Sequence, residues 1–263
     1  VAYYNLGYLY DQGKGVPQDC MKAFDLYQIS AKQGNGLAQS NLGLLYNLGK
    51  VVPKDYKEAL KWYRLSAEQG IKEGQANLGT MHEKGHAVTQ NYNEAIKWYQ
   101  LSADQNFQDG QANLGLMYYQ GKGVPQDYKQ AFKWFKLSAQ QGSMEAQSNL
   151  GVMYQKGKGI PQDYKQAFKW YQLSADQGYG KAQHALGLLY ALGSLGSKNY
   201  VLAYKWLSMA SAQGVKDAAI DKKRVEKKMS LSQIEESKKM ARNQDLKISN
   251  PKEPKPCTHD SSL

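Results

Sequence analysis

The chain has 263 residues, 20 of them tyrosine, a mean hydropathy of −0.69 and a formal net charge of +11. No run of residues approaches the roughly 18 apolar residues of a membrane-spanning helix, so the sequence predicts no membrane span. The basic excess is spread along the chain and no recognised nucleic-acid motif accompanies it, which makes nucleic acid an unfavoured partner.

A unit of 36 residues repeats six times from the N-terminal end, without an insertion. The Leu-Gly pair of the unit recurs at Leu6-Gly7, Leu42-Gly43, Leu78-Gly79, Leu114-Gly115, Leu150-Gly151 and Leu186-Gly187. A glutamine column recurs in phase at Gln33, Gln69, Gln105, Gln141, Gln177 and Gln213. Phased copies of this length predict an all-α solenoid, in which each repeat contacts its neighbours.

Each unit has the pattern of two helices joined by a turn. Residues 146–154 carry the apolar spacing of a first amphipathic helix. Gly157 ends this helix and Pro161 cannot continue it. Asp163 then predicts the N-cap of a second helix, which runs to Gly178. Such a short pair cannot bury its own apolar face, so it must stack on the next pair.

The first helix of every unit contains the glycine of the Leu-Gly pair. A glycine inside a helix costs about 1 kcal/mol relative to alanine. Six such costs in phase predict that another helix passes too close for a side chain at this position.

The repeat pattern decays after residue 214. Ser232 and Glu235 have the spacing of a capping box that opens another helix, with Ile234 and Met240 as its apolar contacts. The sequence therefore predicts six repeats in residues 1–214, a pair of capping helices in residues 215–248 and a disordered tail in residues 249–263. It places Cys20 as a small core residue and Cys257 in the tail, with neither a disulfide framework nor a zinc cluster.

The first helices of a solenoid line a concave groove, where a partner can bind. One column facing that groove is asparagine in five repeats, namely Asn5, Asn41, Asn77, Asn113 and Asn149, and alanine at Ala185. A side-chain amide can bind a peptide N–H and C=O together, as asparagines do in tetratricopeptide repeats by analogy. The same amides could instead hydrogen-bond the neighbouring repeat and set the pitch of the stack. The sequence leaves both interpretations open.

Two flanking columns complete the candidate partner-binding face. Acidic residues lie at one edge, Glu73, Asp109 and Glu145, and Lys84, Gln120 and Lys156 lie at the other. These residues could set specificity for a partner. Acids near helix N-termini and lysines near C-termini are also favourable through the helix dipole alone.

One apparent catalytic motif conflicts with the repeat. His82-Glu83-Lys84-Gly85-His86 matches the zinc-protease pattern H-E-x-x-H, which needs both imidazoles one turn apart on a continuous helix. The repeat phase makes Gly85 the residue that ends the helix and places His86 in the turn. We therefore predict no catalytic residue, no metal site and no cofactor.

The pattern A-x-x-x-L-G-x-[LM]-Y-x-x-G-x-G-V-P-x-D-Y-x-x-A-x-x-W-Y-x-x-S-A-x-Q-G resembles the Sel-one-like repeat (SLR) family, relatives of the tetratricopeptide repeats. Residues 228–234 resemble the closing segment of bacterial members. The resemblance implies a right-handed α/α superhelix that serves as an adaptor for protein complexes. It also implies a bacterial protein that is often exported, lies at the envelope or contacts host proteins. Because the chain starts at Val1 within a helical pattern, we expect a fragment, and the compartment stays open.

Three functional hypotheses remain, of which the second depends mostly on that resemblance and the third on the basic charge. The leading one is a non-enzymatic scaffold that binds a partner protein or peptide in its groove. A second is an envelope protein that acts on or near peptidoglycan, and a third is a solenoid that binds nucleic acid. Some cysteine-rich relatives are credited with penicillin binding or hydrolysis, but this chain lacks their cysteines and the S-D-N and K-T-G motifs.

Overall fold

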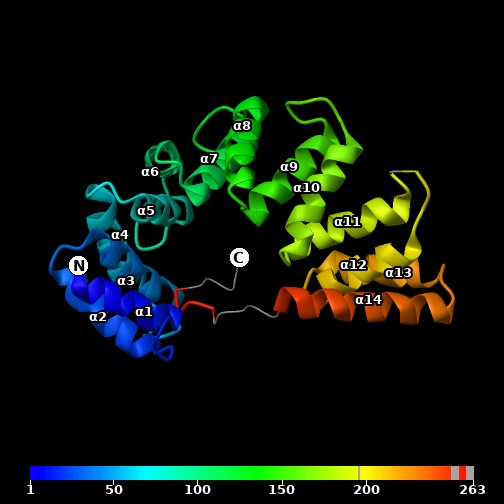
Figure 1. Ribbon diagram of the computed structural model, residues 1–263. Coiled ribbons are helices and arrows are strands. Elements are labelled where there is room, and N and C mark those ends of the chain that lie inside the picture. The colour runs from blue at the N-terminus through cyan, green and yellow to red at the C-terminus, as the bar shows by residue number, and fades with distance from the viewer. Residues whose placement is uncertain (195, 250–254, 259–263) are drawn as a thin grey trace. The chain divides into compact units, whose positions relative to one another are not determined.

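The computed structural model describes residues 1–194, 196–249 and 255–258, and in these residues every regular element is a helix (Figure 1). The first helices of the six repeats are α1 (Ala2–Gln12), α3 (Gly36–Leu48), α5 (Lys72–Lys84), α7 (Gln108–Gln120), α9 (Met144–Lys156) and α11 (Gly180–Leu192). The second helices are α2 (Cys20–Lys32), α4 (Tyr56–Glu68), α6 (Tyr92–Asp104), α8 (Tyr128–Gln140), α10 (Tyr164–Asp176) and α12 (Tyr200–Ala212). The predicted all-α class of stacked helix pairs is confirmed. None of the described helices is long and apolar enough to cross a bilayer.

The helices form two compact units. One comprises Val1–Gln126 together with residues 255–258 of the tail, and the other comprises Asp127–Asn250, so the boundary falls between α7 and α8. Within each unit a helix packs against its partner in the same repeat, as α3 does on α4, and against the next repeat, as α4 does on α5. Each unit is thus a short solenoid.

The helix ends follow the local sequence chemistry. Gly157 ends α9 with a φ of +63°, in the left-handed region that favours glycine. The Asp163 carboxylate caps α10 by accepting from the backbone N–H groups of residues 165 and 166 at 2.8 and 3.0 Å. Both features were predicted and are confirmed.

The glycines inside the first helices lie against the second helix of the same repeat. A Cβ at Gly79 would approach the Tyr99 ring to 2.7 Å, and one at Gly151 would approach the Tyr171 ring to 2.5 Å. Real Cβ atoms essentially never come this close to a neighbour. The prediction that a helix passes too close for a side chain is therefore confirmed.

Buried glutamines connect successive repeats. Gln69 Nε2 donates to Gln39 Oε1 at 2.7 Å, and Gln39 Nε2 donates to the Ala31 carbonyl of the preceding repeat at 3.2 Å. Equivalent side-chain pairs join Gln105 to Gln75, Gln177 to Gln147 and Gln213 to Gln183. This glutamine relay hydrogen-bonds three helices across each repeat boundary where it occurs. The sequence showed the glutamine column as a marker of phase only and did not predict the relay.

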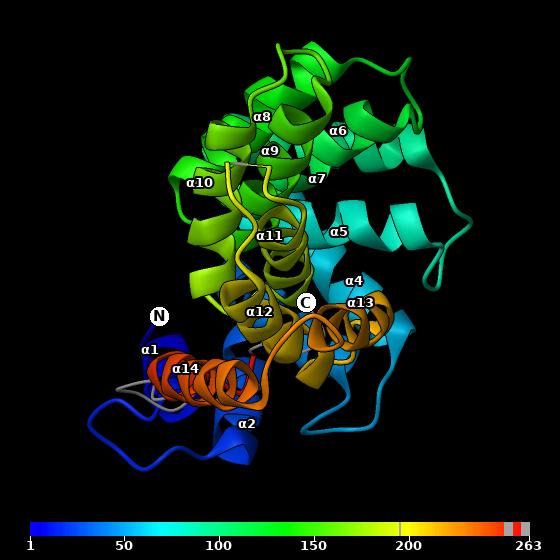
Figure 2. The same cartoon turned by 90° about the vertical axis from the view of Figure 1, so that its right-hand side faces the viewer.

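The stack continues beyond the sixth repeat. Helix α13 (Lys216–Glu226) packs on α12, and α14 (Leu231–Ser249) also lies along α12 rather than pairing with α13 as a hairpin (Figures 1 and 2). The capping box of α14 is formed by Ser230 and Gln233, whose side chains bond each other's backbone N–H groups at 3.3 and 2.9 Å. The box predicted at Ser232 and Glu235 is wrong by two residues, because Ser230 also has glutamine three positions later.

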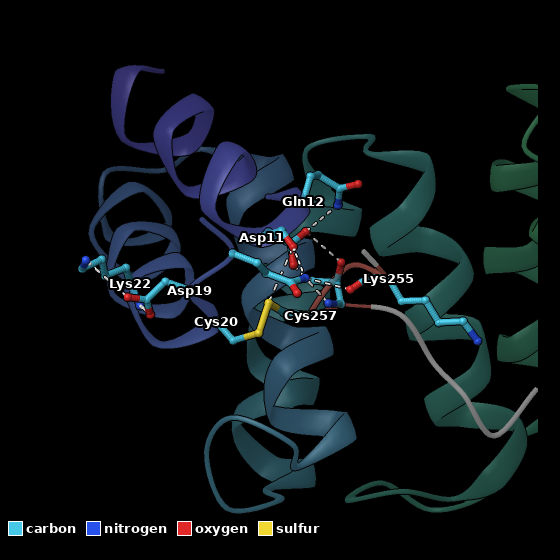
Figure 3. The surroundings of a disulfide bond; sticks show 9 residues. Asp11, Gln12, Asp19, Cys20, Lys22, Lys255 and Cys257 are labelled. Carbon is cyan, nitrogen blue, oxygen red and sulfur yellow. Dashed lines mark hydrogen bonds and ion pairs between the residues drawn. A yellow bond between two sulfur atoms is a disulfide. The ribbon is translucent and has the colours of Figure 1, made fainter. Parts of the chain in front are cut away.

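The tail returns to the first repeat (Figure 3). A disulfide joins Cys20, the first residue of α2, to Cys257, with 5.6 Å between their Cα atoms. The Asp11 carboxylate accepts from the backbone N–H and the hydroxyl of Thr258 at 3.1 and 3.0 Å, and Gln18 Nε2 donates to the carbonyl of Lys255 at 2.7 Å. These contacts order residues 255–258.

Two expectations are therefore corrected. The cysteines form a disulfide, and residues 255–258 pack on repeat one instead of being disordered. Sequence position hid this contact because 236 residues lie between the cysteines, for a separation of 237. The other predicted tail residues after 249 lie outside the described part of the chain.

Candidate protein-binding face

The predicted asparagines all lie on first helices. Asn41, Asn77, Asn113 and Asn149 are half-buried, and Asn5 is exposed. In the unit that begins at Val1, neighbouring first helices touch, α3 with α5 and α5 with α7. The asparagines of these helices therefore recur along one set of adjacent helices, whereas Asn149 belongs to the other unit.

The surroundings of Asn41 bear on its role. Burial raises the pKa of Tyr27 far above its usual range, the Asp11 carboxylate raises it further, and the Asn41 amide partly offsets this rise. Tyr27 belongs to the second helix of the preceding repeat, so Asn41 lies at a repeat boundary. The Tyr27 hydroxyl has no hydrogen-bond partner among the described residues, so this proximity does not by itself make Asn41 a brace between the two repeats.

The flanking columns lie at opposite ends of their helices. Glu73, Asp109 and Glu145 are in the first turns of α5, α7 and α9, and Lys84, Gln120 and Lys156 are the last residues of the same helices. The two columns are 11 positions apart in the sequence, which corresponds to roughly 16 Å along a helix. Lys84, Gln120 and Lys156 are exposed. The dipole interpretation and the specificity interpretation both fit this placement.

A hollow surrounds the first asparagine. Tyr4, Asn5, Tyr8 and Leu9 of α1 line a space of about 400 Å³. Asn5 thus lies exposed beside two tyrosines on the surface of α1.

The residues of the apparent zinc motif lie where the repeat phase placed them. Helix α5 ends at Lys84, and Gly85 has a φ of +69°. His86 follows in the turn and stacks on Tyr56, with 4.1 Å between ring centroids. Burial lowers the pKa of His82 and of His86, and Lys84 and Lys54 lower that of His86 further. Among the described residues, no three His, Cys, Asp or Glu side chains are grouped to hold a metal ion.

The residues equivalent to His86 in other repeats make a similar contact with an aromatic ring. Lys122 lies over the Tyr92 ring at 5.4 Å, and Lys158 lies over the Tyr128 ring at 4.4 Å. His86 occupies the same position in its own repeat and makes the equivalent contact with Tyr56. It is thus one member of a series of contacts between repeats, and its spacing from His82 reflects the repeat.

The residues that sequence reasoning missed had weak signals. Cys20 interrupts a column that is tyrosine in the next five repeats, and the chain has a second cysteine at position 257. That departure could have suggested a pair. The buried glutamines at position 39 and its equivalents recur in phase, which a search for buried polar columns would have found.

The comparisons with known proteins agree with the architecture of six repeats. A family model described as the Sel1 repeat matches residues 1–35, 36–71, 72–107, 108–143, 145–179 and 180–215. A search of curated proteins finds no match.

Several solved structures are similar. A protective antigen of uropathogenic Escherichia coli strains that displays an SLR fold is 35% identical, with a TM-score of 0.83 over 94% of this chain and 53% of that chain. A Sel1 repeat protein from Oxalobacter formigenes is 39% identical, with a TM-score of 0.72 over 80% of this chain and 84% of that one. A Klebsiella pneumoniae repeat protein, at 20% identity and a TM-score of 0.55 over 77% and 99% of the two chains, shares the fold alone. The present chain spans about half the length of the E. coli protein.

Proposed function

The chain belongs to the Sel1 repeat family, whose members act as protein-interaction scaffolds, and we propose that it binds an extended peptide segment of a partner protein along its first helices. The asparagine amides hydrogen-bond the peptide backbone, and the residues at the helix ends determine which peptide side chains are preferred. The chain acts as a binding module and not as an enzyme.

The observation that carries this proposal is that the glutamine and asparagine columns differ in burial and in hydrogen bonding. The glutamine relay supplies hydrogen bonds between repeats, and its members on the first helices are buried. The asparagines on the same helices stay partly accessible. Bracing the stack therefore does not require all the asparagines, and an accessible amide at each repeat can pair with peptide N–H and C=O groups.

The charges at the two ends of the first helices favour a peptide that carries both basic and acidic side chains. Glu73 and Glu145 offer carboxylates at one end of their helices, and Lys84 and Lys156 offer ammonium groups at the other. A peptide that crosses the first helices can place a basic side chain near the acids and an acidic one near the lysines. Such pairs favour one orientation of the peptide more than they raise affinity.

The disulfide bears on where the protein works. Disulfides persist mainly in oxidising compartments, such as the bacterial periplasm and the cell exterior. The Cys20–Cys257 bond therefore supports a protein that functions outside the reducing cytosol. Its partners would be envelope or extracellular proteins.

A peptide library displayed on phage, selected on the immobilised chain, tests the proposal. For a selected micromolar peptide, alanine at Asn77 or Asn113, which lie in one unit, should weaken binding by about 0.5–1.5 kcal/mol each, the net value of a hydrogen bond. The double variant should lose roughly 1–3 kcal/mol of binding free energy, a loss of affinity of about 5-fold to 150-fold. Its melting temperature should barely change.

Gln75→Ala is the matched control, because it removes a buried amide of the relay from α5. It should lower the melting temperature and leave peptide affinity nearly unchanged. A double variant of Asn77 and Asn113 that unfolds early and still binds would contradict the proposal and make these asparagines braces. Equal binding by the wild type and a stable double variant would place the binding surface elsewhere.

A further inference from the structure

The second helices carry an apolar side chain at the same position of every repeat. The series is Ile29, Leu65, Leu101, Leu137, Leu173 and Met209. Leu173 is 50% exposed, whereas Met209 is 1% exposed. Single exposed leucines are common on protein surfaces, but a leucine that recurs in phase and is covered in one repeat indicates a surface suited to packing.

Helix α14 is what covers Met209. It lies along α12 with Ile234, Ser237 and Ala241 buried in the contact (Figure 2). Ser237 Oγ donates to the Val201 carbonyl at 2.8 Å, which requires the two helices to approach closely. Small side chains on α14 permit that approach.

A lysine one turn before Met209 lies in the same contact. Lys205 is buried, with its Nζ 4.1 Å from the Trp206 ring centroid. Burial lowers the pKa of Lys205, while the carboxylates of Asp176 on α10 and Asp245 on α14 oppose that shift. The covered face of α12 thus combines an apolar side chain, a lysine and a carboxylate contributed by the covering helix.

The same face of α8 and α10, in the same unit, carries a half-buried leucine on α8 and an exposed leucine on α10. We call it the second-helix stripe, and it consists of Lys129, Lys133 and Leu137 on α8 and Lys165, Lys169 and Leu173 on α10. Its four lysines are exposed. The residues on each helix are four apart and therefore share one side of it.

The stripe continues from an interface that the chain already uses. Gln244 Nε2 of α14 donates to Asp176 Oδ1 at the end of α10, at 3.1 Å, so α14 extends from α12 to α10. The stripe is also more basic than its equivalents on α4 and α6. There Glu58 and Glu94 pair with Lys61 and Lys97, whereas α8 and α10 carry glutamine at the acidic position.

We propose that the second-helix stripe binds an amphipathic α-helix of a partner protein, which places small residues against the leucines and carboxylates against the lysines. The occupant is a helix because α14 occupies the equivalent face of α12. It is acidic because four lysines on this surface have no acid one turn before them. This surface is separate from the peptide-binding face of the first helices, so its test does not depend on that proposal.

The probe is a fluorescent peptide with the sequence of residues 231–249, stapled on its solvent side and carrying Lys238→Glu, Lys239→Glu and Arg242→Glu. Anisotropy with the full chain should show binding that weakens with added salt. The variant Lys133→Glu with Lys169→Glu should bind the peptide at least roughly tenfold more weakly. Lys133→Arg with Lys169→Arg should bind as the wild type does, and so should Lys32→Glu, a change of an exposed lysine at the end of α2.

Hydrogen exchange identifies the occupied helices. Protection of residues 128–140 and 164–176 on adding the peptide supports the proposal. Protection confined to residues 200–212, which means that the peptide has displaced α14, overturns it. Equal binding by the glutamate variant also overturns it. So does complete competition by a single-stranded oligonucleotide that binds the chain more tightly than the peptide, because the stripe would then be a nucleic-acid surface.

Discussion

The first and last repeats share one sequence pattern, yet their first helices are buried to very different degrees. Leu6 on α1 is 42% exposed and Leu9 is 37% exposed, whereas the equivalent Leu186 and Leu189 on α11 are 0% and 1% exposed. Helix α11 packs on both α10 and α12, whereas the contact described for α1 is with α2. The burial of a first helix is therefore supplied by the second helix of the repeat before it. In a solenoid, identical residues at equivalent positions therefore contribute different amounts to the free energy of unfolding, because their neighbours differ.

The two C-terminal segments, α14 and residues 255–258, are held on their repeats by different interactions. Helix α14 is held on the last repeats by packing and by the Ser237 hydrogen bond. Residues 255–258 are held on the first repeat by a disulfide and by the Asp11 carboxylate. The segment on the first repeat is thus fixed covalently, and α14 is fixed by non-covalent contacts. This comparison predicts where substitutions at matched positions will have different effects.

The largest expected effect is loss of the disulfide. In the chain-entropy account, a bond that closes a loop of 237 residues stabilises a protein by up to about 5 kcal/mol. Cys20→Ser with Cys257→Ser should therefore lower the free energy of unfolding measured in denaturant. Hydrogen exchange should show that α1 and α2 lose protection while α11 and α12 keep theirs. Equal loss at both ends would mean that the disulfide does not act locally on the first repeat.

A buried leucine at the last repeat comes next. Leu186→Ala removes a fully buried side chain and should cost about 3 kcal/mol of stability. Leu6→Ala, the matched change in the first repeat, should cost less than about 1 kcal/mol because this leucine is already partly in water. Thermal unfolding of both variants measures the difference. Similar costs would show that α1 is covered in solution.

The glutamine relay gives a smaller contrast. Gln183 donates to the Ala175 carbonyl at 3.2 Å and accepts from Gln213 at 2.9 Å, so Gln183→Ala should cost about 1–3 kcal/mol. In the first repeat the position equivalent to Gln183 is Tyr3, an exposed side chain in place of the buried amide of the relay. Gln33→Ala should therefore change stability by less than about 0.5 kcal/mol. A large effect at Gln33 would reveal a hydrogen bond at the first repeat that this comparison does not include.

The repeat made much of the fold predictable. The helix ends at Gly157 and Asp163 follow from local chemistry, and six phased copies make each local signal stronger. The disulfide was not predictable, because no local pattern relates Cys20 to Cys257. The capping box of α14 was misplaced because Ser230 and Ser232 both have a suitable partner three residues later. A single end segment offers no second copy to decide between them.

The sequence predicted on which helices the candidate residues lie but not what their side chains contact. The helical period placed Asn77 and Asn113 on first helices, where the structure has them. The period cannot say whether a half-buried amide faces a ligand or a neighbouring repeat. Asn41 lies near Tyr27 of the preceding repeat, but the Tyr27 hydroxyl has no hydrogen-bond partner in the described part of the chain, so even there the role of the amide is not decided. The second-helix stripe was not predicted, because the leucines indicate a packing surface only once α14 is seen to cover the equivalent position on α12.

The smallest expected effect tests how the two C-terminal segments are held. Ser237→Ala removes the only side-chain hydrogen bond shown between α14 and the backbone of α12 among the described residues, and should cost about 1 kcal/mol. Thr258→Val removes a hydroxyl that donates to Asp11 Oδ2, but its backbone N–H still bonds Asp11 and the neighbouring Cys257 is covalently fixed. This change should cost less than about 0.5 kcal/mol.

The contrast should disappear when the disulfide is removed. In the Cys20→Ser, Cys257→Ser background, the Asp11 hydrogen bonds become a main attachment of residues 255–258, so Thr258→Val should now release the segment. Hydrogen exchange at residues 255–258 measures this release, and a double-mutant cycle gives the coupling energy between the hydroxyl and the disulfide. Ser237→Ala should show no such coupling, because its hydrogen bond lies in the other unit. Additive effects at Thr258 would mean that the hydroxyl contributes the same small free energy with and without the disulfide, which contradicts the idea that the two attachments share the task of holding the segment.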